Sequence, residues 1–161
     1  MIMLGIDPGF HCAGFSILKK EQRGIILLDV GYLSMSSNKS LVERVGIFHA
    51  FFNEKVTHWG VTDLAIETPF LGKNAQNFLK LGYLRGILYL IANTHHLALH
   101  EFSPREVKQS VTGYGGAQKD QVARVMIQLF PHLEKPKKED VTDAMAISLC
   151  GVWHKKSILL Q

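Results

Sequence analysis

The sequence predicts one α/β domain with a mixed five-stranded sheet flanked by helices, on the basis of its length, its composition and the order of its elements. The chain has 161 residues, which is the size of a single domain. Hydrophobic residues make up 47% and charged residues 20%, a balance typical of a globular core and not of disorder. Strand-like runs come first and then alternate with helical patterns, which indicates antiparallel strands followed by parallel ones. We expect residues 1–161 to form this one domain.

Three β-prone runs open the chain and predict antiparallel strands. They cover Ile2–Asp7, Ala13–Lys19 and Ile25–Ser34. The tripeptides Asp7-Pro8-Gly9 and Gln22-Arg23-Gly24 separate these runs, and both are typical turn sequences. The pattern therefore indicates a meander of hairpins.

Helical periodicity then takes over and alternates with two more strands. Apolar residues recur at helical spacing from Leu41 to Val56, behind a capping box of Ser40 and Glu43. The next elements are expected at Thr62–Glu67 (strand), about Ala75–Asn93 (helix) and Leu97–Phe102 (strand). Three further helices are expected at Pro104 to near Gly113, behind a second capping box, at Ala117–Phe130 and at about Glu139–Lys155.

The charge distribution permits a nucleic-acid partner. The chain has 18 Lys and Arg against 14 Asp and Glu, a net charge of +4. Two stretches, 68–100 and 107–119, contain no Asp or Glu, which suits a surface that approaches phosphates. A solvated basic face without a ligand is the alternative. The basic residues of these stretches are Lys73, Lys80, Arg85, Lys108 and Lys119.

Several classes of protein are excluded or disfavoured by what the sequence contains. Two cysteines without a CxxC pair, Cys12 and Cys150, argue against a disulfide scaffold or a zinc ribbon, and both are expected to be buried apolar residues. The longest apolar stretch, Gly86–Ala92, is far shorter than a membrane span of about 20 residues. The first residues lack the pattern of a signal peptide, so we expect a cytoplasmic protein.

Four acidic residues occupy positions that suggest a common site. Asp7 and Glu67 each end an apolar strand, and Asp140 and Asp143 lie three residues apart on one face of the last helix. If the first and fourth strands are adjacent and parallel, Asp7 and Glu67 leave the sheet side by side at its carboxyl edge, where α/β folds bind ligands. The last helix then closes the cluster with its two acids.

Converging carboxylates repel one another, and divalent cations relieve that repulsion. An all-oxygen ligand set favours Mg²⁺ or Mn²⁺ over zinc. Two such ions, about 3.5–4 Å apart, activate a water and stabilise the leaving oxygen in phosphodiester hydrolysis. Each acid also has a structural explanation: a turn for Asp7, a strand end for Glu67 and the helix dipole for Asp140. The combination favours a metal site.

Eight short segments, spread in order over nearly the whole chain, carry a family resemblance. They are Leu-Gly-Ile-Asp-Pro-Gly (4–9), Ala-Ile-Glu (65–67), Phe-Leu-Gly-Lys-Asn-Ala (70–75), Leu-Lys-Leu-Gly (79–82), Arg-Gly (85–86), Val-Lys-Gln-Ser-Val-Thr-Gly (107–113), Lys-Asp-Gln-Val (119–122) and Asp-Val-Thr-Asp-Ala-Met-Ala-Ile (140–147). In order and spacing they resemble the RuvC family of Holliday junction resolvases.

The resemblance implies a ribonuclease H-like fold and a homodimer that resolves four-way DNA junctions by paired symmetric nicks, in recombination and repair. It implies Mg²⁺, with two ions per site, and a branch-migration motor as a possible further partner. The family's catalytic acids correspond to Asp7, Glu67, Asp140 and Asp143. Its DNA contacts correspond to Lys108, Lys119 and Phe70, whose ring would stack near the crossover or else be a core aromatic. Lys73 and Lys80 are expected to add sequence-independent phosphate contacts.

Departures from the family pattern are few. They are Phe10, Thr68-Pro69 and Asp120, and they bear on affinity and sequence preference more than on metal chemistry. Three other functions stay open: an actin-like ATPase or sugar kinase, a non-catalytic junction-binding module, and a RuvC-like nuclease acting on RNA. The helix at 75–93 is apolar on more than one side, which indicates either a dimer face or a helix wholly buried in a monomer.

Overall fold

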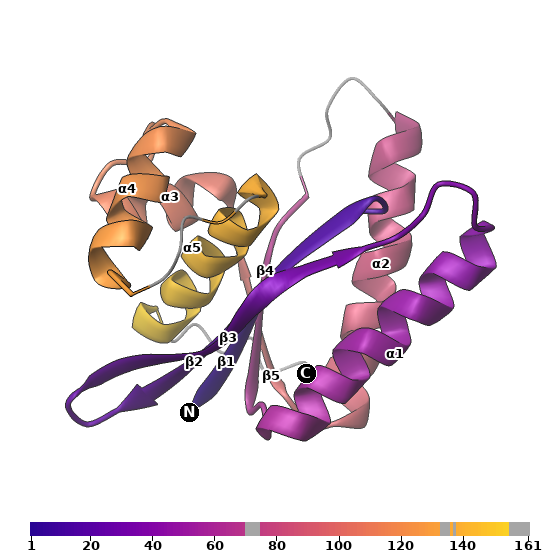
Figure 1. Ribbon diagram of the computed structural model, residues 1–161, viewed down its shortest axis with the longest axis horizontal. Coiled ribbons are helices and arrows are strands. Elements are labelled where there is room, and N and C mark those ends of the chain that lie inside the picture. Colours follow the sequence, from indigo (N-terminus) through magenta and orange to yellow (C-terminus); the bar gives the residue numbers. More distant parts are fainter. Residues whose placement is uncertain (70–74, 133–135, 137, 155–161) are drawn as a thin grey trace.

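The fold is a five-stranded mixed sheet between two layers of helices (Figure 1). The computed structural model describes residues 1–69, 75–132, 136 and 138–154. The strands are β1 Ile2–Asp7, β2 Cys12–Glu21, β3 Gly24–Ser34, β4 Asp63–Glu67 and β5 Ala98–Phe102. The helices are α1 Leu41–Trp59, α2 Ala75–Thr94, α3 Pro104–Thr112, α4 Lys119–Leu129 and α5 Glu139–Trp153.

The strand order β3-β2-β1-β4-β5 confirms the predicted fold class. Strands β1, β2 and β3 pair antiparallel, and β4 and β5 join them in parallel with β1. Because β1 and β4 lie at the centre, both faces of each are buried, and their sequences read as nearly continuous apolar runs.

Most element boundaries lie within one or two residues of the prediction, and the capping chemistry explains where the helices begin and end. Both predicted capping boxes are present, at Ser40 and Ser103. Helix α4 begins at Lys119 instead of Ala117, because Gln118 takes the N-cap position. Helix α5 ends at Trp153, two residues before the predicted end.

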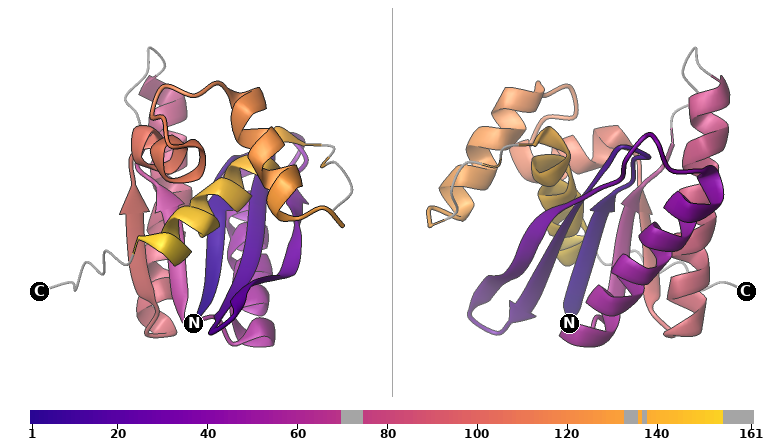
Figure 2. Two further views of the ribbon diagram at one scale, coloured as in Figure 1. Left: turned by 90° about the vertical axis from the view of Figure 1, so that its left-hand side faces the viewer. Right: turned by 45° about the vertical axis from the view of Figure 1, so that its right-hand side comes forward.

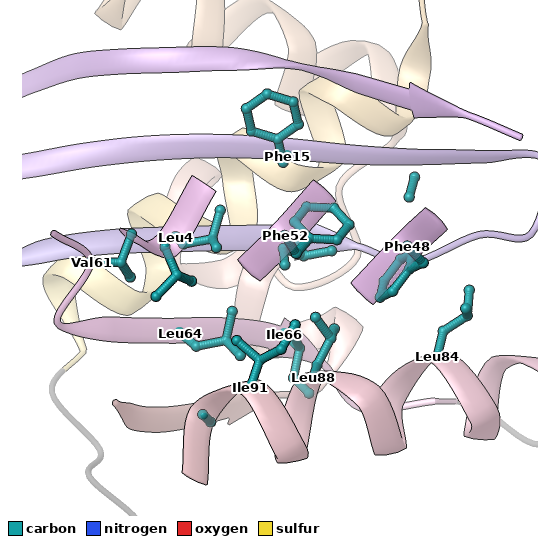
Figure 3. Packing of buried hydrophobic residues seen from close by; sticks show 14 of the residues in the cluster. Leu4, Phe15, Phe48, Phe52, Val61, Leu64, Ile66, Leu84, Leu88 and Ile91 are labelled. Carbon is teal, nitrogen blue, oxygen red and sulfur yellow. The ribbon is translucent and has the colours of Figure 1, made fainter. Parts of the chain in front are cut away.

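Helices α1 and α2 cover one face of the sheet, and α5, with α3 and α4 packed on it, covers the other (Figures 1 and 2). Leu4 of β1 points into the first layer, where Phe48 and Phe52 of α1 lie in one cluster with Leu88 of α2 (Figure 3). Ile6 of β1 belongs to the same cluster. Alternate strand residues such as Met3 of β1 and Ala65 of β4 point into the second layer, against α5.

Helix α5 lies unusually close to β1 and β2 because glycines face it. A Cβ added to Gly5 would lie 2.6 Å from the carbonyl oxygen of Ala144, and one added to Gly14 would lie 1.9 Å from that of Asp140. Farther along the helix, the buried hydroxyls of Ser16 and Ser148 share a hydrogen bond of 2.5 Å. Backbone-to-backbone contact therefore fixes the first turn of α5 over the β1–β2 pair.

Helix α2 is not wholly buried, so that alternative for its apolar character is wrong. Leu84, Leu88 and Ile91 face the core, whereas Tyr83 is 42% exposed and Leu90 is 52% exposed. The helix thus carries an apolar stripe on its outer side as well. In the described part of the chain, no helix is long and apolar enough to cross a membrane.

The close approach at Gly14 yields a first prediction. Gly14→Ala is expected to lower the free energy of unfolding by about 1–3 kcal/mol, the usual cost of overpacking a tight contact, and Tm by about 2–12 °C. Thermal unfolding followed by circular dichroism measures this. The matched control is Gly46→Ala in α1, where no atom lies within 4 Å of the new Cβ, and its Tm should stay level or rise. Equal Tm values for the wild type and Gly14→Ala would contradict the contact.

Candidate functional site

The carboxyl edge of the sheet brings together acids from three elements. The parallel pairing of β1 and β4 aligns Ile6 with Ile66, so that Asp7 and Glu67 leave the two strands at the same edge, as predicted. On its other side, Asp7 is paired with Gly14, against which the backbone of Asp140 packs. The register of β1 and the glycine under α5 therefore bring Asp140 next to Asp7.

Burial and mutual repulsion make it costly for these acids to carry their charges. Burial raises the pKa of the Asp7 carboxyl from 3.8 to about 7, and the charges of Asp143, Asp140 and Glu67 act in the same direction. Burial, and then the charge of Asp143, raises the pKa of Glu67 from 4.5 to about 7. The pKa of Asp143 is itself raised, mainly by burial. An opposite charge placed among these carboxylates would therefore be strongly stabilising.

Two predicted DNA-contacting lysines supply part of that positive charge. The ammonium of Lys119, at the start of α4, donates to Asp143 Oδ2 at 3.2 Å and to Glu139 Oε2 at 3.3 Å. The charge of Asp143 in turn raises the pKa of Lys119. The positive charge of Lys108 in α3 lowers the pKa of Glu67 against the effect of burial. Both lysines thus act directly on the acidic cluster.

The other predicted DNA contacts are placed differently. Lys80 is exposed on α2, a helix that begins at the end of the molecule where β4 finishes (Figure 1). Phe70 and Lys73 lie outside the described residues. Of the departures from the family pattern, Phe10 is a core residue under the guanidinium of Arg44, and Asp120 is paired with Arg124 at 2.7 Å.

Three polar residues at this edge were not among the predicted site residues. Cys12 is half-buried, so its predicted burial is wrong; it begins β2 beside the cluster, and burial together with a hydrogen bond to Asp140 raises the pKa of its thiol to about 11. Glu139 shares Lys119 with Asp143. Arg85 of α2 donates to the backbone carbonyl of Glu67. A signal for Arg85 was available, because the residue lies beside Leu84 and one turn before Leu88 in the apolar pattern.

The chemistry of this donor set fits a divalent cation. The cluster offers carboxylate oxygens, which Mg²⁺ and Mn²⁺ prefer, and their charges are destabilised until a cation compensates them. As the side chains stand, no three His, Cys, Asp or Glu groups in the described residues are close enough to hold one ion together. Like-charged carboxylates repel, so such spacing is expected of the uncompensated cluster.

The raised pKa values predict how stability depends on pH. Between about pH 4 and pH 7, the folded protein keeps protons at Asp7 and Glu67 that the unfolded chain has released. Stability in EDTA is therefore fully present below this window and falls as the pH rises through it. Asp7→Asn should flatten the decline and stabilise the protein at pH 8, by on the order of 2 kcal/mol, because a neutral amide replaces a buried charge. Thermal unfolding from pH 4.5 to 8.5 measures both effects.

Two results would contradict the raised pKa values of Asp7 and Glu67. One is a wild-type Tm in EDTA that rises from pH 5 to pH 8, and the other is Asp7→Asn being less stable than wild type at pH 8. Glu54→Gln, a change to an exposed acid of α1 away from the sheet edge, is the matched control and should leave the slope unchanged.

Comparison with known proteins identifies the family to which the chain belongs. Residues 3–151 match the family model described as crossover junction endodeoxyribonuclease RuvC. RuvC of Pelodictyon phaeoclathratiforme is 37% identical over 152 residues, which cover 94% of this chain and 80% of that protein. A solved structure of Thermus thermophilus RuvC matches with a TM-score of 0.86 at 28% identity, and one of T. thermophilus RuvC in complex with a Holliday junction substrate matches with a TM-score of 0.85 at 25% identity. Each match covers 95% of this chain and 94% of that one. The chain therefore belongs to the RuvC family of crossover junction endodeoxyribonucleases, with their ribonuclease H-like fold.

Proposed function

We propose that this protein resolves four-way DNA junctions by paired symmetric nicks and that Asp7, Glu67, Asp140 and Asp143 form its metal-binding active site. Membership of the family makes it an endodeoxyribonuclease, a Holliday junction resolvase of DNA recombination and repair, and implies a metal-dependent enzyme. The observation that carries the site assignment is the meeting of Asp7 and Glu67 at one sheet edge, beneath the first turn of α5.

The carboxylates of these four residues would hold Mg²⁺, with Mn²⁺ as a substitute and two ions per site. Held by these carboxylates, such ions would supply the chemistry that activates a water and stabilises the leaving 3′ oxygen of the cleaved phosphodiester. The chain's own contribution is to fix the ligands on rigid elements: two strand ends and one helix that cannot move away from the sheet without losing backbone packing.

The lysines around the cluster would guide the DNA backbone to it. Lys119 and Lys108 already interact with the acids, so a phosphate arriving at the site would meet positive charge on its α3 and α4 side. Lys80 and Lys73 would add contacts from α2 and the segment before it, and Phe70 would stack at the crossover. The relative solved with a Holliday junction substrate supports this choice of ligand.

Paired nicks require two active sites, and the outer face of α2 is suited to hold two copies together. Leu79, Tyr83 and Leu90 form an exposed apolar stripe on this helix. Gly82 and Gly86 lie in the same stripe with open space around them, which allows a second helix to approach closely. We extend the proposal to a cytoplasmic place of action, on the sequence pattern of the first residues, and to a branch-migration motor as partner, on the family resemblance alone.

The alternatives weighed from the sequence are less favoured. Residues 4–9 lie within the RuvC family match, which disfavours the hypothesis of an actin-like ATPase or sugar kinase. A non-catalytic module would have no reason to keep four acids together at a cost in stability. A nuclease acting on RNA has the same metal chemistry, so only the choice of substrate separates it from a junction resolvase.

The proposed activity is tested on a synthetic mobile four-way junction, labelled on each strand in turn, with Mg²⁺ or EDTA. We expect symmetric nicks in two opposing strands with Mg²⁺ only, and Asp7→Asn should bind the junction normally while its cleavage rate falls at least about 100-fold, since it removes a metal ligand. A linear duplex and an RNA–DNA hybrid serve as control substrates. Cleavage of the hybrid in preference to the junction would favour the RNA nuclease, and binding without nicks under any divalent ion would favour the non-catalytic module.

The proposed dimer face has its own test. Leu90→Glu should shift the protein from dimer to monomer in light scattering after gel filtration, because a charge would be buried between the two copies. On the junction it should replace paired nicks with uncoupled single ones. Val42→Glu, at an apolar residue of α1 that is 82% exposed, is the matched control and should remain dimeric. A dimeric Leu90→Glu variant would remove α2 from the interface.

A further inference from the structure

Arg85 is a charged residue buried in the core, and the proposed chemistry does not use it. Its side chain is only 8% exposed, because it lies beside Leu84 and Leu88 in the stripe of α2 that packs on the sheet. Burying a guanidinium is costly unless charged or polar groups satisfy it. Its partners therefore indicate what the residue is for.

The partners of Arg85 all lie near the carboxyl edge of the sheet. The guanidinium donates to the backbone carbonyl of Glu67, to the carboxylate of Glu101 and, at 2.8 Å, to the hydroxyl of Tyr89. The Tyr89 hydroxyl in turn donates to Glu101 Oε1 at 2.8 Å. One side chain of α2 thus joins the ends of the parallel strands β4 and β5, where Glu67 is paired with Phe102 and Ile66 with Glu101.

The end of β4 needs such support because the sheet holds it on one side only. The pairing with β1 ends at Ile66, whereas the pairing with β5 continues to Glu67. After Glu67 the chain leaves the sheet at Thr68, whose amide donates to the carbonyl of Phe102 at 2.7 Å. Among the described residues of the helix layers, Arg85 donates to the carbonyl of Glu67 and so holds it in place.

We infer that Arg85 is a positioning residue that fixes the backbone of Glu67, and with it the direction in which the Glu67 carboxylate points into the metal site. The inference rests on the proposed function, in which Glu67 is a metal ligand. Holding a carboxylate in place matters here because the neighbouring acids repel it. Hydrogen bonds that orient a ligand typically change metal affinity about 10–100-fold when they are lost.

Arginine and lysine differ in a way that separates positioning from simple stabilisation. The planar fork of arginine reaches the Glu67 carbonyl and Glu101 together, whereas a single lysine ammonium has a shorter reach and no fork. Arg85→Lys keeps the buried charge next to Glu101 and should preserve much of the stability. If Arg85 only stabilises the fold, Arg85→Lys should bind the metal as tightly as wild type, because it keeps much of the stability.

The experiment measures Mn²⁺ binding by calorimetry and by the Mn²⁺-induced rise in Tm, in the full-length protein without DNA. We expect Arg85→Lys to raise the Mn²⁺ dissociation constant about 10–100-fold. The dissociation constant for the junction in EDTA should stay within about twofold of the wild-type value, and the variant should remain a dimer. In the cleavage assay, more Mg²⁺ should be needed for half-maximal rate. Glu101→Gln, which weakens the hold on Arg85 but leaves its bond to Glu67, should produce a smaller shift in the same direction.

The control is Lys55→Met, which breaks the partly buried 2.7 Å ion pair with Asp29 between α1 and β3. It should lower Tm without changing Mn²⁺ affinity. Wild-type Mn²⁺ affinity in Arg85→Lys would overturn the inference; if that variant does not fold, wild-type affinity in Glu101→Gln would overturn it instead.

Glu67→Gln is measured alongside to keep the two claims apart. If Glu67→Gln cleaves junctions and binds Mn²⁺ like wild type, the assignment of Glu67 in the proposed function fails. If Glu67→Gln loses Mn²⁺ binding while Arg85→Lys keeps it, only the role of Arg85 fails.

Discussion

The direct contact between the backbone of α5 and the β1–β2 pair is the constraint on which the site depends. It exists because Gly5 and Gly14 have no side chain to separate the layers. The contact fixes both the distance of α5 from the sheet and its position along the strands. Since Gly14 is paired with Asp7, the same contact decides which acid of the sheet meets the acids of the helix. Gly5 and Gly14 thus determine both how α5 packs on the sheet and which acids come together.

A cluster held this tightly stores unfavourable electrostatics, and the fold offsets them only in part. Burial and repulsion bring the pKa of Asp7 and of Glu67 to about 7, while Lys119 and Lys108 act against this rise from the outer side. The packing of α5 on the glycines fixes the backbone that carries these carboxylates. The stability lost at this edge is compensated by the two buried apolar layers on either side of the sheet.

The sequence was sufficient to predict the mixed five-stranded sheet and most helix limits, because these follow from periodicity. It predicted the meeting of Asp7 with Glu67 on the condition that the first and fourth strands are parallel neighbours, which the structure confirms. It did not predict the role of Gly14, which depends on a register that periodicity does not determine. It gave Arg85 only as a basic residue of an acid-free stretch and did not predict its partners, since these depend on how α2 lies across β4 and β5. The exposure of Cys12 depends in the same way on where α5 begins.

The carboxylates of the acidic cluster repel the phosphates of DNA, and positive charge elsewhere on the protein acts against this repulsion. The net charge of +4 and the two acid-free stretches attract DNA over a distance, but at the cluster itself carboxylates and phosphates would repel each other. Lys119 is the only described ammonium that donates directly to one of the four acids, and it also serves Glu139. Because the compensation by lysine is incomplete, a cation and a phosphate bound together at the proposed site would each favour the binding of the other. Reciprocal coupling of this kind would hold the cutting chemistry back until both were bound.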